Sequence, residues 1–261
     1  MAIFIVAEAG VNPGGSVDEA KRLIDAAKNS GANACKFQLF NSQRLWGDAR
    51  ITHLEFSEAQ MIILSDHAKN AGIEFLCTPF GILEVQFLAP LVKRMKIASG
   101  CIRRYDLLTA VAKTNLPVIL STGMSDLDDV RFALMHLGSD VTLLHCTSAY
   151  PCPINAVNLN AMDTLRIFHR PVGYSDHTAS IVVPIAAAAK GAVVIEKHLT
   201  LDRNAIGPDH KASINPSQFK VMVDGIRRVE LALGDGIKRP QSCEFPLQKA
   251  WREHLPSDRP A

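Results

Sequence analysis

Short apolar segments rich in Val, Ile and Phe recur along the chain, and each is followed by an amphipathic stretch with the period of a helix. This alternation is typical of βα units built around a parallel sheet. Several segments are apolar throughout, which indicates strands that are covered on both faces. The eight segments expected to form strands are residues 4–9, 34–38, 74–79, 95–99, 117–122, 141–147, 172–176 and 192–198.

The stretches between these segments carry helix start and stop signals. Ser16 and Glu19 have the spacing of a capping box, and Gly31 is expected to end the helix that they begin. Proline directly after an N-cap residue, as in Asn215-Pro216, is a further start signal. The other expected starts are Ser57 and Ser125, with stops at Gly72 and Gly138.

Eight strands that alternate with helices predict a (β/α)8 TIM barrel, a fold that commonly occupies about 250 residues. A doubly wound open sheet is the alternative, but no GxGxxG motif follows the first strand, and residues 10–15 lack the lysine of a Walker loop. The barrel is expected to span residues 1–233. Residues 234–261 are expected to form a C-terminal tail or linker stub, with at most one short helix at 247–254. The long connection at 40–56 is expected to be functional or mobile.

Composition excludes several classes of protein. The 28 Lys and Arg nearly balance the 26 Asp and Glu and are interspersed with them, so a nucleic-acid partner is not expected. No apolar run reaches the roughly 20 residues of a membrane span, and the N-terminus has no secretory signal. The six cysteines form no CxxC pair, which argues against a disulfide scaffold. We therefore expect a cytoplasmic protein that binds no membrane.

Polar side chains gather where the expected strands end, which is the catalytic face of such a barrel. Each one alone has an ordinary structural explanation. Lysines and hydroxyls that converge on one mouth are unfavourable unless they bind an anion, so the set predicts a site for phosphate and carboxylate. The residues are Glu8, Lys36, Gln38, Thr78, Lys96, Ser99, Ser121, Thr122, His145, Thr147, Ser148, Tyr150, Ser175, Asp176, His177, Glu196, Lys197 and His198.

Two histidines, His177 and His198, follow adjacent expected strands at this rim. Imidazole suits Mn, Fe, Co or Zn, and a site with two histidines leaves positions open for a substrate oxygen. A hydrogen-bonded histidine pair without metal is the alternative.

Nine short motifs, taken together and in order, resemble the sialic acid synthase family. The resemblance extends over residues 3–233. The motifs are AEAGVN at 7–12, KFQ at 36–38, TPF at 78–80, KIASG at 96–100, STGM at 121–124, HCTSAYP at 145–151, GYSDHT at 173–178, EKH at 196–198 and GPDH at 207–210.

This resemblance implies that phosphoenolpyruvate condenses with an N-acetylmannosamine-type amino sugar to give a nine-carbon 2-keto acid of sialic or legionaminic type and phosphate. His177 and His198 are the implied ligands of a divalent metal, typically Mn²⁺, with Mg²⁺ or Co²⁺ as alternatives. The implied catalytic residues are Glu8, Lys36, Lys96, Tyr150, His177 and His198. Implied contacts to phosphoenolpyruvate are Lys36, Thr78, Lys96, Ser99, Ser121, Ser148, Tyr150 and Ser175. Implied contacts to the sugar are Glu8, Gln38, Cys101, Tyr150 and Asp209.

The chain departs from the family pattern in three places. Cys101 stands where the family usually has an acid, and a thiol with a pKa of about 8.5 replaces a carboxylate poorly, so turnover is expected to be reduced. Pro13 stands where the family commonly has histidine. The family's C-terminal antifreeze-like domain, which reaches across a dimer, would begin near Ala261. The resemblance implies a homodimer, and a separate C-terminal lid domain is one alternative beside a natural short form.

Two alternatives to this function remain. The first is a barrel that binds phosphoenolpyruvate without turnover, or only with a lid, and acts with a partner. The second is a related condensing enzyme that uses phosphoenolpyruvate and a smaller aldehyde.

Overall fold

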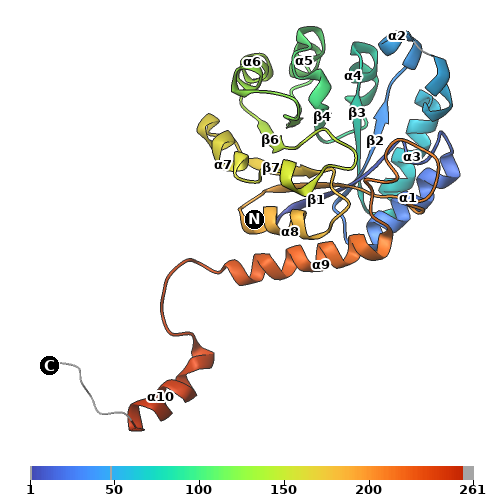
Figure 1. Ribbon diagram of the computed structural model, residues 1–261. Coiled ribbons are helices and arrows are strands. Elements are labelled where there is room, and N and C mark those ends of the chain that lie inside the picture. The colour runs from blue at the N-terminus through green and yellow to red at the C-terminus, as the bar shows by residue number, and fades with distance from the viewer. Residues whose placement is uncertain (1, 48, 255–261) are drawn as a thin grey trace.

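A computed structural model describes residues 2–47 and 49–254 (Figure 1). Its eight strands form one parallel sheet in the order β3-β2-β1-β8-β7-β6-β5-β4, with helices outside the strands. The predicted (β/α)8 barrel is therefore confirmed. The strands are β1 (Phe4–Gly10), β2 (Ala34–Leu39), β3 (Glu74–Pro79), β4 (Met95–Ile97), β5 (Val118–Ser121), β6 (Val141–His145), β7 (Val172–Asp176) and β8 (Val194–His198).

The barrel is nearly closed. The first and last strands pair in parallel from Phe4 opposite Val194 to Glu8 opposite His198. Within the described ranges no hydrogen-bonded ladder joins β3 to β4, although these two strands lie side by side. The sheet therefore has one seam, between β3 and β4.

Helices cover the outside of the sheet and bury their apolar faces against it. The described α-helices are α1 (Val17–Asn29), α2 (Ser42–Trp46), α3 (Glu58–Ala71), α4 (Ile82–Leu88), α5 (Tyr105–Ala112), α6 (Leu127–Leu137), α7 (Ala161–Leu165), α8 (Val182–Ala189), α9 (Pro216–Leu233) and α10 (Phe245–His254). Five short 3-10 helices are η1 (Ala49–Leu54), η2 (Ser99–Cys101), η3 (Ile154–Ala156), η4 (Arg166–Phe168) and η5 (Ser242–Glu244).

Most of the predicted helix caps occur, and one lies a residue away from its expected place. Ser16 caps α1, and Ser57 and Asn215 each form a capping box, on α3 and α9. Ahead of α6 the N-cap is Asp126 and not Ser125. The Asp126 carboxylate accepts from two backbone N–H groups and is close to the positive end of the helix dipole, a role in which a carboxylate serves well.

Four strands are shorter than expected. The strand expected at 117–122 spans Val118–Ser121, and the strand expected at 192–198 begins at Val194. The strand expected at 95–99 ends at Ile97, because the backbone turns into η2 and the Cys101 N–H donates to Ala98 O within that turn. The strand expected at 141–147 ends at His145. Beyond β4, Ala98, Ser99 and Gly100 line the cavity, and in the loop after β6 Ser148 and Tyr150 line it.

One layer of apolar side chains fills the interior of the barrel below the carboxyl ends of the strands. It is separate from the larger core between sheet and helices. Six strands contribute to this layer, so the barrel interior is a packed floor and not a channel. Its members are Val6, Ala34, Leu76, Ile119, Leu144 and Val194.

The tail leaves the barrel after α9. Figure 1 shows α10 apart from the barrel, and the residues from 235 to 252 are exposed except for the half-buried Gln248. The expected helix at 247–254 begins two residues earlier, at Phe245. The end of the expected tail, 255–261, lies outside the described residues.

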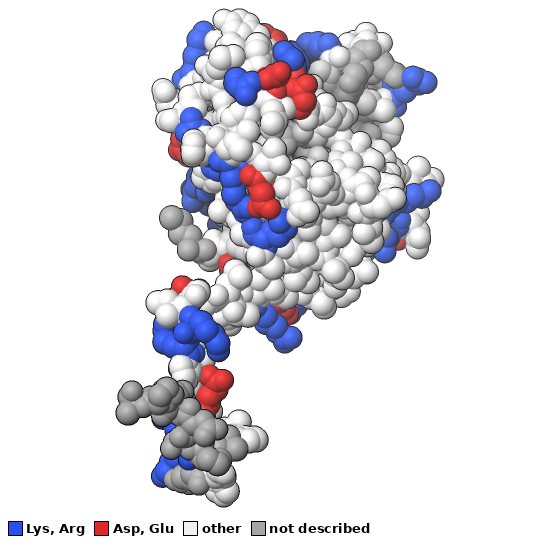
Figure 2. All heavy atoms as spheres, turned by 60° about the vertical axis from the view of Figure 1, so that its left-hand side comes forward, with Lys and Arg blue, Asp and Glu red and all other residues white. Residues whose placement is uncertain are grey.

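The outer surface shown in Figure 2 has Lys and Arg interspersed with Asp and Glu over the barrel, in keeping with the small net charge. Among the described residues, no helix combines the length and the apolar character that crossing a bilayer requires.

Candidate active site

A cavity of about 530 Å³ opens at the carboxyl ends of the strands. All eight strands or the loops that follow them contribute to its wall. It brings together thirteen of the fourteen residues to which the family resemblance implies a role: Glu8, Lys36, Gln38, Thr78, Lys96, Ser99, Ser121, Ser148, Tyr150, Ser175, His177, His198 and Asp209. Of the other strand-end residues expected at this face, Glu196 also lines the cavity, whereas Thr122, His145, Thr147, Asp176 and Lys197 do not. The long connection at 40–56 also contributes, through Phe40, Ile51 and Leu54.

Cys101 is the exception. Its side chain is buried, and it is not among the lining residues, whereas Ser99 and Gly100 are. With about three residues per turn in the 3-10 helix η2, consecutive side chains point roughly 120° apart, so Ser99 and Cys101 face different directions. The expected contact between Cys101 and the sugar therefore finds no support in this geometry.

The position of the polar residues follows from the period of the strands. Side chains at i and i+2 lie on the same face of a strand, so the residue two positions after each floor residue also points into the barrel. The polar side chains consequently form a layer directly above the apolar floor. The pairs are Val6 and Glu8, Ala34 and Lys36, Leu76 and Thr78, Ile119 and Ser121, and Val194 and Glu196.

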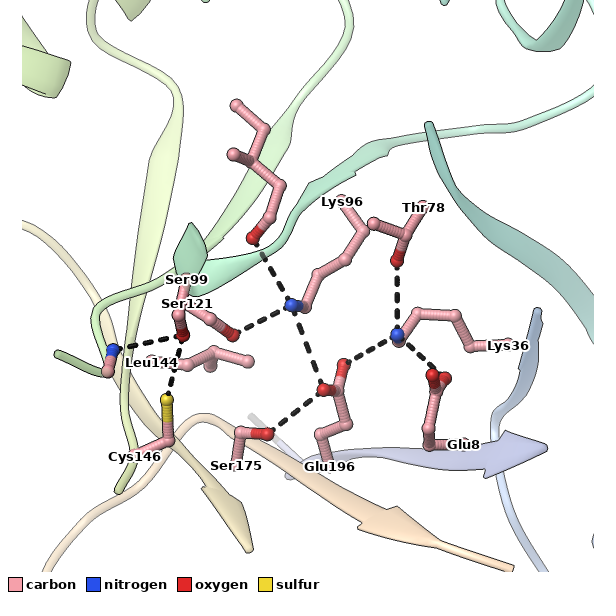
Figure 3. Close-up of polar contacts among 12 residues, drawn as sticks. Glu8, Lys36, Thr78, Lys96, Ser99, Ser121, Leu144, Cys146, Ser175 and Glu196 are labelled. Carbon is pink, nitrogen blue, oxygen red and sulfur yellow. Dashed lines mark hydrogen bonds and ion pairs between the residues drawn. The ribbon is translucent and has the colours of Figure 1, made fainter. Parts of the chain in front are cut away.

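Glu196 occupies the centre of this layer (Figure 3). Its carboxylate lies 3.7 Å from both Lys36 Nζ and Lys96 Nζ, and Ser175 Oγ donates to its Oε1 at 3.0 Å. No hydrogen-bond partner of its Oε2 occurs among the described residues. The sequence placed Glu196 among the strand-end residues expected at this face, although the family resemblance implied no role for it; its place two residues before His198 on one strand was the signal that it shares the cavity.

Each lysine has a second set of partners. Lys36 Nζ lies 2.6 Å from Glu8 Oε2 and donates to Thr78 Oγ1 at 3.1 Å, and Lys96 Nζ donates to Ser121 Oγ at 2.7 Å. Both lysines are almost completely buried. Two buried ammonium groups among hydroxyls and carboxylates are suited to bind an anion that takes over these contacts.

Burial and the neighbouring charges shift the pKa values of Glu8 and Glu196 in opposite directions. Burial raises the pKa of Glu8 to about 7, and this exceeds the lowering effect of Lys36. Burial also acts to raise the pKa of Glu196, but the two lysines outweigh it and the pKa is lowered. Glu196 is therefore the carboxylate that balances the lysines, while Glu8 can exchange a proton near neutral pH.

A glycine allows three side chains to meet on the opposite wall. A Cβ at Gly123 would lie 2.3 Å from Ser148 Oγ, 3.0 Å from Cys146 Sγ and 3.0 Å from Ser99 Oγ. The backbone N–H of Gly123 donates to Ser99 Oγ at 3.0 Å. Only a residue without a side chain leaves room for these hydroxyls beside the backbone.

The two histidines lie together at the cavity wall, with ring centroids 5.4 Å apart. His177 Nδ1 is 2.7 Å from Thr147 O, so this nitrogen carries the proton and Nε2 keeps its lone pair; Nε2 lies 3.1 Å from the Tyr150 hydroxyl. His198 Nδ1 is buried and has no hydrogen-bond partner within the described ranges. Burial lowers the pKa of both imidazoles, so both are neutral at pH 7.

This donor set fits a divalent metal. The ligands that such ions require from histidine are neutral imidazoles with free lone pairs, and a second-shell carbonyl that fixes the tautomer is typical of them. Among the described residues there is no group of three or more His, Cys, Asp or Glu side chains arranged around a common point. A metal at this pair would therefore take its remaining ligands from substrate or water.

A carboxylate reaches the histidines from the loop after β8. Asp209 Oδ2 lies 3.5 Å from His198 Nδ1, and burial raises the pKa of Asp209 to about 6. The loop is anchored by the Asn12 side-chain amide, which donates to Leu199 O and to Ser213 Oγ, each at 2.9 Å. Asp209 is thus held over the cavity by contacts that lie outside it.

Comparisons with known proteins agree with this geometry. The model of the NeuB family matches residues 23–238. An uncharacterized protein of Methanocaldococcus jannaschii is 46% identical over 252 residues, covering 92% of this chain and 75% of its own. The N,N'-diacetyllegionaminic acid synthase of Legionella pneumophila is 43% identical over 284 residues, covering 98% of this chain and 80% of its own.

Solved structures give the same result. The N-acetylneuraminic acid synthetase of Leptospira borgpetersenii has a TM-score of 0.90 and 36% identity, covering 98% of this chain and 93% of its own. A truncated 3-deoxy-D-arabino-heptulosonate 7-phosphate synthase of Thermotoga maritima, at 15% identity and a TM-score of 0.72, shares the fold. The resemblance to sialic acid synthases is therefore confirmed, and the chain belongs to the NeuB family.

Proposed function

We propose that this protein condenses phosphoenolpyruvate with an N-acetylmannosamine-type amino sugar to form a nine-carbon 2-keto sugar acid and release phosphate. The observation that carries this proposal is the cavity above the apolar floor. It combines two buried lysines, several hydroxyls and two neutral histidines in a chain whose named relatives include acid synthases.

Phosphoenolpyruvate would occupy the lysine side of the cavity. Its phosphate and carboxylate would replace the long contacts that Lys36 and Lys96 make with Glu196, and charge-assisted hydrogen bonds to such groups are among the stronger ones in proteins. Hydroxyl groups around the lysines would donate further hydrogen bonds to the anion. The proposed contacts are Lys36, Thr78, Lys96, Ser99, Ser121, Ser148, Tyr150 and Ser175.

His177 and His198 would hold a divalent metal, with Mn²⁺ the proposed ion and Mg²⁺ or Co²⁺ as alternatives. When bound, the metal would polarise the aldehyde of the open-chain sugar as a Lewis acid. Burial raises the pKa of Tyr150, so its phenol stays protonated and can donate a hydrogen bond beside His177.

The bonds that change follow from the two substrates. C3 of the enol forms the new bond to the aldehyde carbon, which becomes an alcohol; water then adds at C2, and the C2–O bond breaks as phosphate leaves. Glu8, with its pKa near neutrality, would take the proton from the water, and Lys36 beside it would stabilise the resulting charges. Gln38 and Asp209 would hold the sugar.

The acceptor proposed is the 2,4-diacetamido sugar of the legionaminic type. Relatives named N,N'-diacetyllegionaminic acid synthase are 43% and 42% identical to this chain. The human N-acetylneuraminate-9-phosphate synthase is 36% identical, and a pseudaminic acid synthase of Campylobacter jejuni is 34% identical. The higher sequence identity to the legionaminic acid synthases favours the legionaminic branch.

Phosphate release tests the proposal. The protein is incubated with phosphoenolpyruvate and Mn²⁺, in parallel with N-acetylmannosamine, with 2,4-diacetamido-2,4,6-trideoxymannose, and without acceptor. We expect release that depends on the acceptor, is fastest with the diacetamido sugar, and stops when a chelator is added. Release at equal rates without acceptor, or no release with either sugar, would contradict the proposed reaction.

A homodimer and a cytoplasmic location remain predictions. Sedimentation equilibrium checks the first of these: a particle with the mass of two chains is expected, and a monomer at micromolar concentration would contradict it.

A further inference from the structure

A buried ion pair lies directly behind the two histidines. Lys197 Nζ is 2.6 Å from Asp176 Oδ2, and both side chains are completely buried. Asp176 and Lys197 face each other in the register of β7 and β8, and each directly precedes one histidine. Because successive side chains of a strand point to opposite faces, the pair lies on the outer face of the sheet while His177 and His198 point into the cavity.

The Lys197 ammonium holds both neighbours of His177. It forms its ion pair with the Asp176 side chain and also donates to the backbone carbonyl of Thr178. Lys197 itself is bonded covalently to His198. The Lys197 side chain therefore ties residues 176–178, which carry His177, to the end of β8, which carries His198.

The carboxylate of this pair has a full set of partners. Asp176 Oδ1 accepts from the Tyr174 hydroxyl at 3.0 Å and from the Thr178 N–H at 3.2 Å, and Oδ2 accepts from Thr178 Oγ1 at 2.9 Å. In contrast to the Glu196 carboxylate in the cavity, it has no oxygen without a hydrogen bond. Asp176 and Lys197 also do not line the cavity. They are thus not available to substrate.

Stability alone does not account for such a pair. Apolar residues of similar size at a buried ion pair are often equally or more stabilising, whereas charged hydrogen bonds specify one geometry. Here the ion pair specifies the spacing between the strand ends that carry His177 and His198. Removing a group that hydrogen-bonds a metal ligand typically lowers metal affinity about 10–100-fold, because the ligand loses its orientation; this pair acts on the orientation of the histidines through the backbone that carries them.

We propose that the Lys197–Asp176 ion pair positions His177 relative to His198 and thereby sets the affinity of the site for its divalent metal. The inference depends on the metal site of the proposed function. Lys197 and Asp176 are positioning residues in this account, because they act through the histidines and touch neither metal nor substrate.

The test measures Mn²⁺ binding to the substrate-free protein, from the EPR signal of free Mn²⁺ during titration. Lys197→Met removes the ammonium, and the double variant Asp176→Asn, Lys197→Met removes both charges, so that no unpaired buried charge opposes folding. Lys190→Met is the matched control, because Lys190 forms a partly exposed ion pair with Asp163 at 2.8 Å, away from the cavity. Circular dichroism and melting temperature report the fold of each variant.

We expect the double variant to be folded and to bind Mn²⁺ about 10–100-fold more weakly than the unchanged protein, with Lys190→Met unaltered. A folded double variant with unchanged Mn²⁺ affinity would overturn the positioning role, even if its melting temperature fell. His177→Ala separates the two proposals. Mn²⁺ binding that survives in His177→Ala, or is missing from the unchanged protein, would overturn the metal site and the positioning role together.

Discussion

At the residue scale, the buried lysines determine how tightly the cavity binds an anion. Lys96→Met should raise the KM for phosphoenolpyruvate about 10–100-fold, because a hydrogen bond to a charged group contributes roughly 1.5–3 kcal/mol and each 1.4 kcal/mol is tenfold in affinity. The KM for the sugar should change little. Steady-state kinetics with each substrate varied in turn measures both, and Lys220→Met is the control because the Lys220 side chain is exposed on α9. An unchanged KM for phosphoenolpyruvate would remove Lys96 from the anion site.

Glu8 should make the stability of the protein depend on pH. Its pKa is about 7 in the folded protein against 4.5 for an ordinary glutamate, so the folded state holds a proton that the unfolded state has lost between these values. This contribution is present at pH below 4.5 and is lost as the pH rises through 7. Glu8→Gln lacks it, so the melting temperature of the variant relative to the unchanged protein should increase from pH 5 to pH 8. Melting curves with chelator present measure this difference, and a constant difference would contradict the raised pKa.

The residues of the site were largely predictable because chemistry and position pointed the same way. Lysines, histidines, hydroxyls and acidic or amide side chains at strand ends stand out against apolar segments, and thirteen of the fourteen residues implied by the resemblance line one cavity. The position of Glu196 at the mouth was expected, but its partners were not, because they come from other strands: the structure pairs Glu196 with the cavity lysines and Lys197 with Asp176. Cys101 was placed by motif alone, and the turn of η2 directs it elsewhere.

At the scale of elements, α9 shows how much a single cap contributes. The Asn215 side chain accepts from the Gln218 N–H, and the Gln218 side chain accepts from the Asn215 N–H. Asn215→Ala should lower the free energy of unfolding by about 1 kcal/mol and the melting temperature by about 2–4 °C. Calorimetry checks this, with Lys220→Ala on the same helix as control. Equal melting temperatures for the two variants would show that the cap is dispensable.

Element types were predictable from the sequence, and element ends less so. Apolar runs separated by helical periodicity set the eight strands, because burial on both faces of a strand leaves no polar alternation. The end of β4 depends on a 3-10 turn at residues 99–101 that has no apolar period of its own. The cap of α6 depends on which of two adjacent polar residues, Ser125 or Asp126, faces the first turn.

At the scale of the whole molecule, the barrel and the tail should behave independently. Deletion of residues 236–261 should leave the melting temperature unchanged, because the described residues there are almost all exposed and α10 lies apart from the barrel in Figure 1. Calorimetry of both chains measures the effect. A clear decrease in melting temperature would show that the tail packs against the barrel or against a second copy of it.

The barrel fold was predictable from the sequence, but the incomplete closure of the barrel between β3 and β4 was not. A count of strands indicates a barrel, whereas no residue pattern encodes that a hydrogen-bonded ladder is missing between β3 and β4 within the described residues. The arrangement of charges at the mouth likewise depends on distances between strands that are far apart in the chain, such as β2 and β8.

The spacing of two residues between floor and site also bears on how such a chain can evolve. On each strand the floor residue and the cavity residue point to the same side because they are two positions apart, as with Ala34 and Lys36. Inserting or deleting one residue in β2 would turn the lysine outward and bring its neighbours Cys35 or Phe37 inward, so both floor and site would be lost at once. Changes of length are therefore tolerable only between strands. New acceptor preferences should accordingly arise by lengthening or shortening the connections at 40–56 and 199–215, while the strands vary by substitution alone.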